Sequence, residues 1–390
     1  MNTPKHQRRT KVLFFLENLG GGGAEKVLTT IARYLDRALY EVTVCCIQDT
    51  GVYIQTIKET ADHYVALVPN ISELKGWKRF WAKKKRLLIH KWLPASWVYR
   101  LFVPKQHDVE IAFLEGAPTR ILSASTNNSA RKIAWIHIDL RLLNPLAHFI
   151  PSHQGQKKAL SKFDDIVGVS KTVSDSIREL YSFNEVLTIY NPLDAKDIHL
   201  QAEQKNIQLP EKKQQFRLIS VGRYVPQKAF DRLLRSVKRL LNDGISLELW
   251  LVGDGALRPE YEQWISDNHL EDFVTLWGFQ SNPYTFIKNS DLFVCSSFVE
   301  GYNIAISEAL ILGIPVLTTN FTPDEHTARE NLCIIVDNDE EALYQGLKSL
   351  LSNPLHLESQ RELVKNGRDI FDTAEAMKPI TSLLLPRIPD

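Results

Sequence analysis

The sequence predicts an α/β protein with two Rossmann-like domains, each built on a parallel sheet. Its 390 residues exceed the size of one ordinary domain, so two domains are the expected number. Short apolar runs alternate along the chain with segments of helical periodicity, a pattern typical of βαβ units. In each half, one apolar run leads through a glycine-containing loop into a helix: residues 12–16 before Gly20–Gly23, and residues 291–295 before Gly301.

The composition is that of a soluble globular protein, with 44% hydrophobic and 24% charged residues. A formal net charge of +1 gives no reason to expect a nucleic-acid partner. The four cysteines show no C-x-x-C spacing, which favours buried free thiols in a reducing compartment over disulfides or a metal site. Residues 12–16 are too short for a signal peptide, and no apolar stretch is long enough to span a membrane. We therefore expect a cytoplasmic protein.

The first half reads as a domain of residues 1–200. Further apolar runs are predicted as strands at residues 40–47, 64–68, 109–114, 132–138, 165–169 and 187–190. The glycine loop after the first strand fits neither G-x-G-x-x-G, because Glu25 stands where the third glycine belongs, nor the G-K-[ST] of a P-loop. Its glycines fit either a close approach of backbone to ligand or a tight turn only.

Residues 75–105, from Lys75 to Lys105, differ from everything around them. They carry ten basic and no acidic residues, interleaved with four tryptophans. Basic residues alternating with tryptophan are what an interfacial helix presents to an anionic membrane. The alternatives are a solvated basic helix with its aromatic residues in the core, and a nucleic-acid patch, which the neutral chain disfavours. The first expectation is an anionic membrane surface as partner.

The second half reads as a domain of residues 201–370, after a polar linker at residues 197–215. Its predicted strands are residues 216–221, 247–252, 274–276, 291–295 and 315–319, with residues 333–336 at the edge. The strand at 274–276 leads to Gly278, and the strand at 291–295 leads to a helix that begins near Asn303. The tail, residues 371–390, contains a last helical run at 374–384.

Two carboxylates and two cations follow strand ends in this second half. Glu300 lies in the loop before the helix and Glu308 in its second turn, where backbone N–H groups suit a phosphate and the carboxylates suit hydroxyls. Arg223 and Lys228 follow another strand, five residues apart, and suit a diphosphate leaving group. This combination fits a ligand that carries both phosphates and a polyhydroxylated ring.

Together these residues resemble a known family. Glu300 and Glu308, followed by Gly313 and Pro315, resemble the E-x7-E motif of the retaining GT-B glycosyltransferases of family GT4. The G-R-x4-K arrangement ending at Lys228 resembles the diphosphate site of the same family, and the loop at Gly20–Gly23 resembles its glycine loop. The resemblance implies the GT-B fold: two Rossmann-like domains facing a central cleft, with a C-terminal helix that crosses back to the first domain.

The resemblance also implies roles for single residues. Glu308 is expected to hold the ribose, and Arg223 and Lys228 the diphosphate. His137, at the end of a first-domain strand, matches a position that contacts the donor sugar. The remaining donor contacts are expected from Gly21, Gly22, Gly278, Glu300, Gly301, Asn303, Ile304 and Ala305. The expected catalytic group is His137, Glu300, Arg223 and Lys228.

The implied activity is transfer of a hexose-type sugar, with retention, from a nucleotide-diphosphate donor, with UDP expected as the nucleotide. The acceptor would be a lipid-linked or other glycan at the cytoplasmic membrane face, in surface polysaccharide, lipopolysaccharide or capsule synthesis. Neither a metal nor another cofactor is expected, because the resemblance implies that cationic side chains neutralise the diphosphate in GT-B enzymes. A GT-B nucleotide-sugar epimerase and a non-catalytic partner subunit stay open as alternatives. The chain departs from the family pattern at residues 303–305 and 320–326, which leaves the donor sugar undefined.

Overall fold

The computed structural model describes residues 8–204, 208–321, 332–367 and 370–385. It divides into two compact units, one formed by Met1–Pro192 with Ala374–Asp390 and the other by Leu193–Thr373. The change from one unit to the other falls eight residues before the boundary expected from the sequence. The departure noted at residues 320–326 lies mostly in residues 322–331, outside the described part of the chain.

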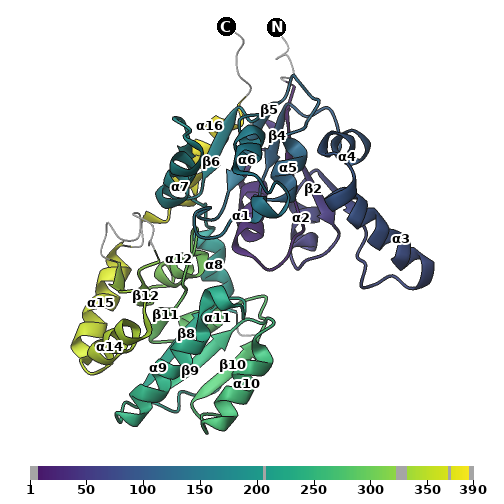
Figure 1. Cartoon of the computed structure of the whole chain (residues 1–390). Helices are drawn as coiled ribbons and strands as arrows, with labels where there is room; N and C mark the ends of the chain where they lie inside the picture. The colour runs from purple at the N-terminus through teal and green to yellow at the C-terminus, as the bar shows by residue number, and fades with distance from the viewer. Residues whose placement is uncertain (1–7, 205–207, 322–331, 368–369, 386–390) are drawn as a thin grey trace. The chain divides into compact units, whose positions relative to one another are not determined.

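The first unit is built on seven parallel strands in the order β3-β2-β1-β4-β5-β6-β7 (Figure 1). The strands are β1 (Thr10–Leu16), β2 (Tyr40–Gln48), β3 (His63–Val68), β4 (Val109–Ala112), β5 (Arg131–Ile136), β6 (Asp165–Gly168) and β7 (Leu187–Thr188). Each predicted apolar run of this half became a strand, with ends displaced by a few residues. The core of this unit contains an aromatic cluster: Phe113 packs edge-on against Phe14, with ring centroids 5.5 Å apart, and its ring centroid lies 5.2 Å from that of Trp135.

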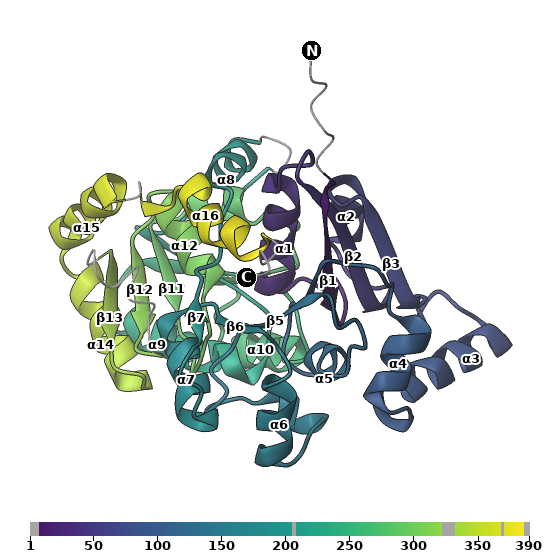
Figure 2. The same cartoon turned by 90° about the horizontal axis from the view of Figure 1, so that it is seen from above.

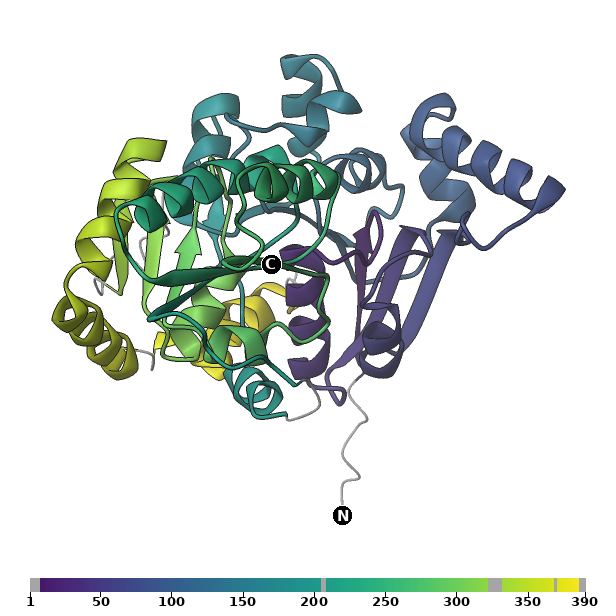
Figure 3. The same cartoon turned by 90° about the horizontal axis from the view of Figure 1, so that it is seen from below.

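The helices of the first unit connect these strands. They are α1 (Gly23–Tyr34), α2 (Ile54–Thr60), α3 (Gly76–Leu87), α4 (Ala95–Phe102), α5 (Ala117–Leu122), α6 (His153–Leu160) and α7 (Lys171–Tyr181). A single π-helical turn, Leu88–Trp92, joins α3 to α4. In Figure 2 and Figure 3, α3 projects beyond the β3 edge of the sheet. Most of the last helix, α16 (Thr373–Leu383), also belongs to this unit: the Tyr40 hydroxyl donates to the Thr381 carbonyl at 3.1 Å.

The second unit contains six parallel strands in the order β10-β9-β8-β11-β12-β13. The strands are β8 (Phe216–Val221), β9 (Leu247–Val252), β10 (Val274–Gly278), β11 (Leu292–Cys295), β12 (Val316–Thr319) and β13 (Cys333–Val336). The helices are α8 (Ala195–Ala202), α9 (Phe230–Asn242), α10 (Arg258–Asp267), α11 (Tyr284–Lys288), α12 (Ile304–Ile311), α14 (Glu340–Leu351) and α15 (Pro354–Gly367). Its core joins the apolar faces of α9 and α14 to the sheet.

One segment of the second unit differs from its prediction. Residues 197–215 were expected to form a linker, but they begin inside α8. Asp194 caps this helix, because its carboxylate accepts a hydrogen bond from the Asp197 N–H at 3.0 Å. Ile198 and Ala202 are buried on its inner face. The helix escaped prediction because two buried residues are too few to reveal a helical period in a polar segment.

The strand orders locate the edge where ligands bind. In both sheets the chain starts in the middle, at β1 or β8, winds outward to one side and then returns to start the other side. In such sheets the crevice for ligands opens at the carboxyl ends of the two strands where the direction changes. These are β1 and β4 in the first unit and β8 and β11 in the second.

Candidate functional site

The loop between β11 and α12 carries the first predicted carboxylate. Asn303 caps α12: its side-chain oxygen accepts hydrogen bonds from the N–H groups of Ala305 at 3.1 Å and Ile306 at 3.4 Å. Its amide nitrogen donates to the Cys295 sulfur at 3.1 Å, so the cap is anchored to the end of the preceding strand. The helix therefore starts where the sequence predicted.

Glu300 and Lys228 meet in the second unit. The Lys228 Nζ lies 2.6 Å from Glu300 Oε1, and their side chains are only 17% and 10% exposed. The Ser297 hydroxyl donates to the same carboxylate oxygen at 2.7 Å. Sequence reasoning assigned the lysine to phosphate and the glutamate to sugar. The structure pairs them with each other, so a ligand that takes either group must share or break this ion pair.

The loops after β8, β9 and β10 are fastened to one another. The Gly222 N–H donates to the Val252 carbonyl at 3.0 Å, and the Gly253 N–H donates to the Gly278 carbonyl at 2.8 Å. Gly253 has φ of +140°, and a Cβ there would lie 1.9 Å from the Gly222 oxygen. Only glycine permits this approach. The predicted donor contact Gly278 thus serves as a backbone partner of the neighbouring loop.

The Lys228 side chain lies against the backbone of these glycine-containing loops. A Cβ on Gly222 would lie 3.0 Å from the Lys228 Cε, so the lysine stem lies against the glycine backbone. Arg223, the next residue, is exposed, and within the described residues its guanidinium has no hydrogen bond or ion pair. Of the two predicted phosphate ligands, the lysine is therefore held by a carboxylate, and the arginine extends into solvent.

Glu308 lies on α12 and is 3% exposed. The Tyr284 hydroxyl, from the short helix α11, donates to its Oε1 at 3.3 Å. Ile304 and Ala305 lie in the first turn of α12, just after the Gly301 loop. The six residues expected to contact the donor between Glu300 and Glu308 thus belong to one loop and one helix.

In the first unit, the glycine loop follows β1 and His137 follows β5, at the carboxyl ends of two strands that flank β4. Gly21 is exposed, and Gly22 precedes the first residue of α1 without a side-chain cap. A Cβ on Gly22 would lie 2.3 Å from a carboxylate oxygen of Glu25, so this carboxylate folds back over the loop. The structure therefore places a carboxylate of α1 beside the glycines from which donor contacts were expected.

His137 directly follows β5 and is partly buried. Its backbone N–H donates to Glu115 Oε2 at 2.9 Å, and its ring packs against Phe113 with centroids 4.9 Å apart. Burial lowers the pKa of His137 to about 3, so the imidazole is neutral at pH 7. Its Nε2 is buried without a hydrogen-bond partner among the described residues. The ring is therefore equipped to donate or accept one hydrogen bond, not to supply a positive charge.

Glu115, which sequence reasoning treated only as the end of a strand, shares this position. Burial raises the pKa of its carboxyl group, although the His137 N–H and a second backbone N–H oppose the shift. No simple sequence signal marks it, since a single Glu-Gly after a strand is common.

The aromatic side chains of the basic segment at residues 75–105 are largely exposed. The exposed fractions are 72% for Trp77, 52% for Phe80, 54% for Trp81, 61% for Trp92 and 58% for Trp97. Ala82 is the one buried residue of α3. Lys84 lies over the Phe80 ring at 4.6 Å from its centroid. The alternative in which these aromatic residues fill the core is therefore wrong.

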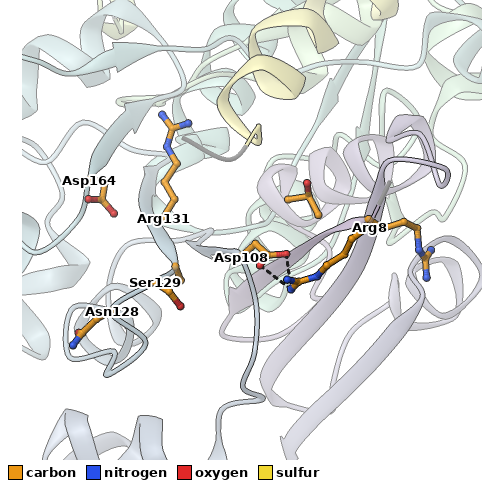
Figure 4. Close-up of a pocket in the computed structure, with 9 residues that line it drawn as sticks. Arg8, Asp108, Asn128, Ser129, Arg131 and Asp164 are labelled. Carbon is orange, nitrogen blue, oxygen red and sulfur yellow. Dashed lines mark hydrogen bonds and ion pairs between the residues drawn. The ribbon is translucent and has the colours of Figure 1, made fainter. Parts of the chain in front are cut away.

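A pocket of about 420 Å³ lies at the amino ends of the strands of the first sheet (Figure 4). It is lined by Arg8, Arg9, Thr10, Asp108, Asn128, Ser129, Ala130, Arg131 and Asp164. Arg8 pairs with Asp108 at 3.0 Å, and Arg131 pairs with Asp165 at 2.6 Å. Because it opens at the amino ends of β1 and β5, it is separate from the predicted site residues. Across the described residues, no cluster of His, Cys, Asp and Glu could hold a metal ion.

The same fold is found among solved structures. The structure of the Anabaena protein HepE in complex with UDP-glucose matches with a TM-score of 0.67 at 18% identity, over 96% of this chain and 99% of that one. The two parallel-sheet units are accordingly those of the GT-B fold.

The sequence of the second unit matches a known family. Residues 201–370 match the family described as glycosyl transferases group 1. The second unit of the chain thus matches this family of glycosyltransferases.

Two relatives align with this part. The first is the N-acetylgalactosamine-N,N'-diacetylbacillosaminyl-diphospho-undecaprenol 4-alpha-N-acetylgalactosaminyltransferase of Campylobacter jejuni, 29% identical over 50% of this chain and 53% of the relative. The second is the lipopolysaccharide core biosynthesis glycosyltransferase LpsD of Rhizobium meliloti, 31% identical over 44% of this chain and 48% of the relative. The chain thus spans about half the length of these relatives.

All four cysteines are free and buried, as predicted. No helix in the described part of the chain is long and apolar enough to cross a bilayer.

Proposed function

We propose that the chain transfers a hexose-type sugar, with retention of anomeric configuration, from a UDP-sugar to a lipid-linked glycan at an anionic membrane surface. The observation that carries this proposal is the Lys228–Glu300 ion pair, in which Nζ and Oε1 lie 2.6 Å apart. The pair lies in the second unit, next to the glycine-containing loops after β8, β9 and β10 and before the N-terminus of α12. A cation for phosphate and a carboxylate for sugar hydroxyls are adjacent there, in the part of the chain that matches the glycosyltransferase family.

The chemistry follows from these charges. The bond between the anomeric carbon and the diphosphate oxygen breaks, and the acceptor hydroxyl oxygen forms the new bond on the same face. The acceptor proton passes to the departing phosphate. Lys228 and the solvent-exposed Arg223 would neutralise the charge that develops on the diphosphate, which removes the need for a metal. Glu300 would hold the sugar hydroxyls, and Glu308 those of the ribose. This arrangement needs no protein nucleophile.

His137 would contribute from the first unit as a neutral hydrogen-bonding group. Its buried, unpartnered Nε2 would gain a partner when a sugar hydroxyl binds. Its role in the proposed mechanism is therefore to orient the sugar. The pH dependence of transfer between pH 5 and 8 should come from other groups, since the pKa of His137 lies at about 3.

The donor and acceptor classes are supported by relatives. The matching Anabaena structure contains UDP-glucose, and the Campylobacter relative is named for an acceptor linked to diphospho-undecaprenol. The Rhizobium relative is named for lipopolysaccharide core synthesis. A membrane-bound acceptor also gives a use for α3, whose exposed aromatic residues lie among lysines and arginines.

The first experiment measures UDP release from a panel of UDP-sugars in the presence of bacterial membrane lipids. We expect one donor to be consumed only when lipid is present, with a glycolipid product. Lys228→Ala and Glu308→Ala should abolish transfer and leave the thermal unfolding midpoint close to that of Arg235→Ala, a surface control. Full activity of both variants would refute the site. Conversion of a UDP-sugar without any acceptor would instead identify an epimerase.

The second experiment tests the membrane surface by flotation with vesicles of phosphatidylcholine alone or with 30% phosphatidylglycerol. We expect binding only to the anionic vesicles. Replacing Trp77 and Trp81 by alanine should abolish it, whereas Leu355→Ala, at an 82% exposed apolar residue of the second unit, should not change it. Equal binding by both variants would refute the role of α3.

A further inference from the structure

Arg232, on α9, is an arginine that the proposed chemistry does not use. It is 2% exposed, although its helix has a polar outer face. Its Nε donates to the Ser296 carbonyl at 2.8 Å, and its NH2 donates to the Ser297 carbonyl at 2.9 Å. Both acceptors are the first residues after β11. The guanidinium therefore lies directly beneath the turn that leads to Glu300.

The same guanidinium reaches two further strand ends. It donates to the Thr319 hydroxyl at 3.3 Å, at the end of β12. It also donates to the Asn338 side-chain oxygen at 2.7 Å and to the Asn338 carbonyl at 3.3 Å, in the loop after β13. One side chain thus holds the carboxyl ends of three consecutive strands. Most of its partners are backbone or side-chain oxygens of neutral groups, which suits the fixed fork of a guanidinium.

The turn between Ser296 and Glu300 is closed around this contact. The Phe298 ring lies over the guanidinium of Arg232, with 4.3 Å between the ring centroid and Cζ. Phe298 as a whole is 50% exposed. The Phe298 carbonyl accepts from the Asn338 amide at 2.9 Å, and the Phe298 N–H donates to the Gln227 carbonyl at 2.9 Å. The turn is therefore held from one side by Arg232 and Asn338 and from the other by the segment that carries Lys228.

A second set of bonds links this turn to Lys228 itself. The Ser296 hydroxyl donates to the Lys228 carbonyl at 2.9 Å, and the Gln227 amide donates to the Val299 carbonyl at 2.8 Å. Lys228 and Glu300 thus belong to two segments that are bonded to each other. Because Arg232 fixes one of them at Ser296 and Ser297, a change at this arginine moves both charged groups.

We propose that Arg232 is a positioning residue of the candidate active site. It sets the Ser296–Ser297 backbone, and through that backbone the Glu300 carboxylate and the Lys228 ammonium that it pairs with. The residue touches neither donor nor acceptor in this assignment. The inference rests on the proposed function for its catalytic consequence, while its structural part, the order of the turn, stands by itself.

The variant to test is Arg232→Lys, which keeps the charge but loses the fork. An ammonium has three donors on a flexible stem, so it cannot serve the acceptors after β11, β12 and β13 together. Arg235→Lys is the matched control. Arg235 lies one turn further along α9 and pairs with Asp231 and Glu340, half-exposed, without contact to any strand end.

The first measurement is hydrogen exchange of the peptide that covers residues 296–303. In Arg232→Lys we expect the Phe298 amide, which bonds to Gln227, to exchange about tenfold faster or more, and strands β8 and β9 to keep their protection. Arg235→Lys should match the wild type. Unchanged exchange in the turn would overturn the proposal, and so would an equal rise throughout the second unit, which would indicate general loss of stability.

The second measurement separates binding from turnover with the UDP-sugar identified by the panel. Arg232→Lys should lower kcat about 30- to 100-fold, because a misplacement of about 1 Å is enough for such a loss. KM and the Kd for UDP should rise by a smaller factor than kcat falls, because Lys228 is displaced while Gly222, Arg223 and Glu308 remain in place. Guanidinium ion added to Arg232→Ala should restore part of kcat, and the same ion should have no effect on Arg235→Ala. Wild-type kcat in Arg232→Lys, or no rescue by guanidinium, would overturn the proposal.

The two assays also separate this inference from the proposed function. A wild-type chain that releases no UDP from any sugar would refute the transferase assignment, yet the exchange of the Phe298 amide would still decide whether Arg232 orders the turn. A wild-type chain that transfers sugar, with Arg232→Lys fully active, would refute the positioning role alone.

Discussion

The pairing of Lys228 with Glu300 predicts which substitutions strengthen UDP binding and which weaken it. The Lys228 ammonium is neutralised by a carboxylate oxygen of Glu300 at 2.6 Å. A diphosphate that binds Lys228 must compete with that carboxylate. Glu300→Gln keeps the shape of the side chain and removes the competing charge, so it should tighten UDP binding. Lys228→Met removes the ligand of the diphosphate and should weaken it.

The magnitude follows from the geometry. A hydrogen bond to a charged group contributes about 1.5–3 kcal/mol, and each 1.4 kcal/mol changes an equilibrium constant tenfold. The side chains are mostly buried, so solvent screens the pair only in part. We expect Kd for UDP to rise about 10- to 100-fold in Lys228→Met and to fall up to about tenfold in Glu300→Gln, because the Ser297 hydroxyl and the amide oxygen retain part of the contact.

The assay is calorimetric titration of UDP into each single variant and the double variant. In Lys228→Met the substitution at Glu300 has no ammonium left to release, so the double variant should bind UDP like Lys228→Met alone. Weaker UDP binding in Glu300→Gln, or equal effects of the two single variants, would refute the idea that the carboxylate and the diphosphate compete for Lys228.

Three further predictions concern the frame of the site. His137→Gln should make the free energy of unfolding depend less on pH in the acid range. The imidazole takes a proton near pH 6.5 in the unfolded chain and only near pH 3 in the folded one, so His137 costs the wild type about 1–2 kcal/mol of stability by pH 5. Thermal unfolding at pH 7.5 and 5 measures this cost, and the two proteins would show no such difference if the ring were accessible. Gly253→Ala should cost at least about 3 kcal/mol in chemical denaturation, whereas Gly244→Ala, at φ of +84° in open space, should cost about 1–2 kcal/mol; equal losses would contradict the packing of the loops. Tyr284→Phe should weaken UDP binding about fivefold through Glu308, as a net hydrogen bond of about 1 kcal/mol requires, and unchanged affinity would count against ribose binding there.

The strands were the part of the fold most open to prediction. Those of a doubly covered parallel sheet are continuous apolar runs, so Phe216–Val221 and Leu247–Val252 were located to the residue. The start of α12 was equally clear, because an asparagine cap before an apolar run is a local signal. The helix α8 was missed, since its cap precedes a polar segment with two inward residues. The change from the first unit to the second, at Pro192–Leu193, falls just before this helix.

Contacts between distant segments could not be predicted. Lys228 and Glu300 are 72 residues apart, and their separate roles in the sequence gave no sign that they pair. Arg232 was unnoticed because an arginine beside an apolar helix face is normally at the surface. The carboxylate of Glu25 over the glycine loop is a similar case. Each depends on how strand ends and helix starts come together, which a linear pattern does not contain.

The return of α16 gives the chain an order of assembly. The first unit is interrupted in sequence by the whole of the second, and its Tyr40 hydroxyl bonds to a carbonyl 341 residues later. A growing chain therefore emerges from the ribosome with most of its first unit made but without the helix that Arg131 and Tyr40 contact. The second unit, by contrast, is uninterrupted and has all its strands before α16 appears. Completion of the first unit thus waits for the second, and a chain cut after Thr373 would leave those two contacts unmade.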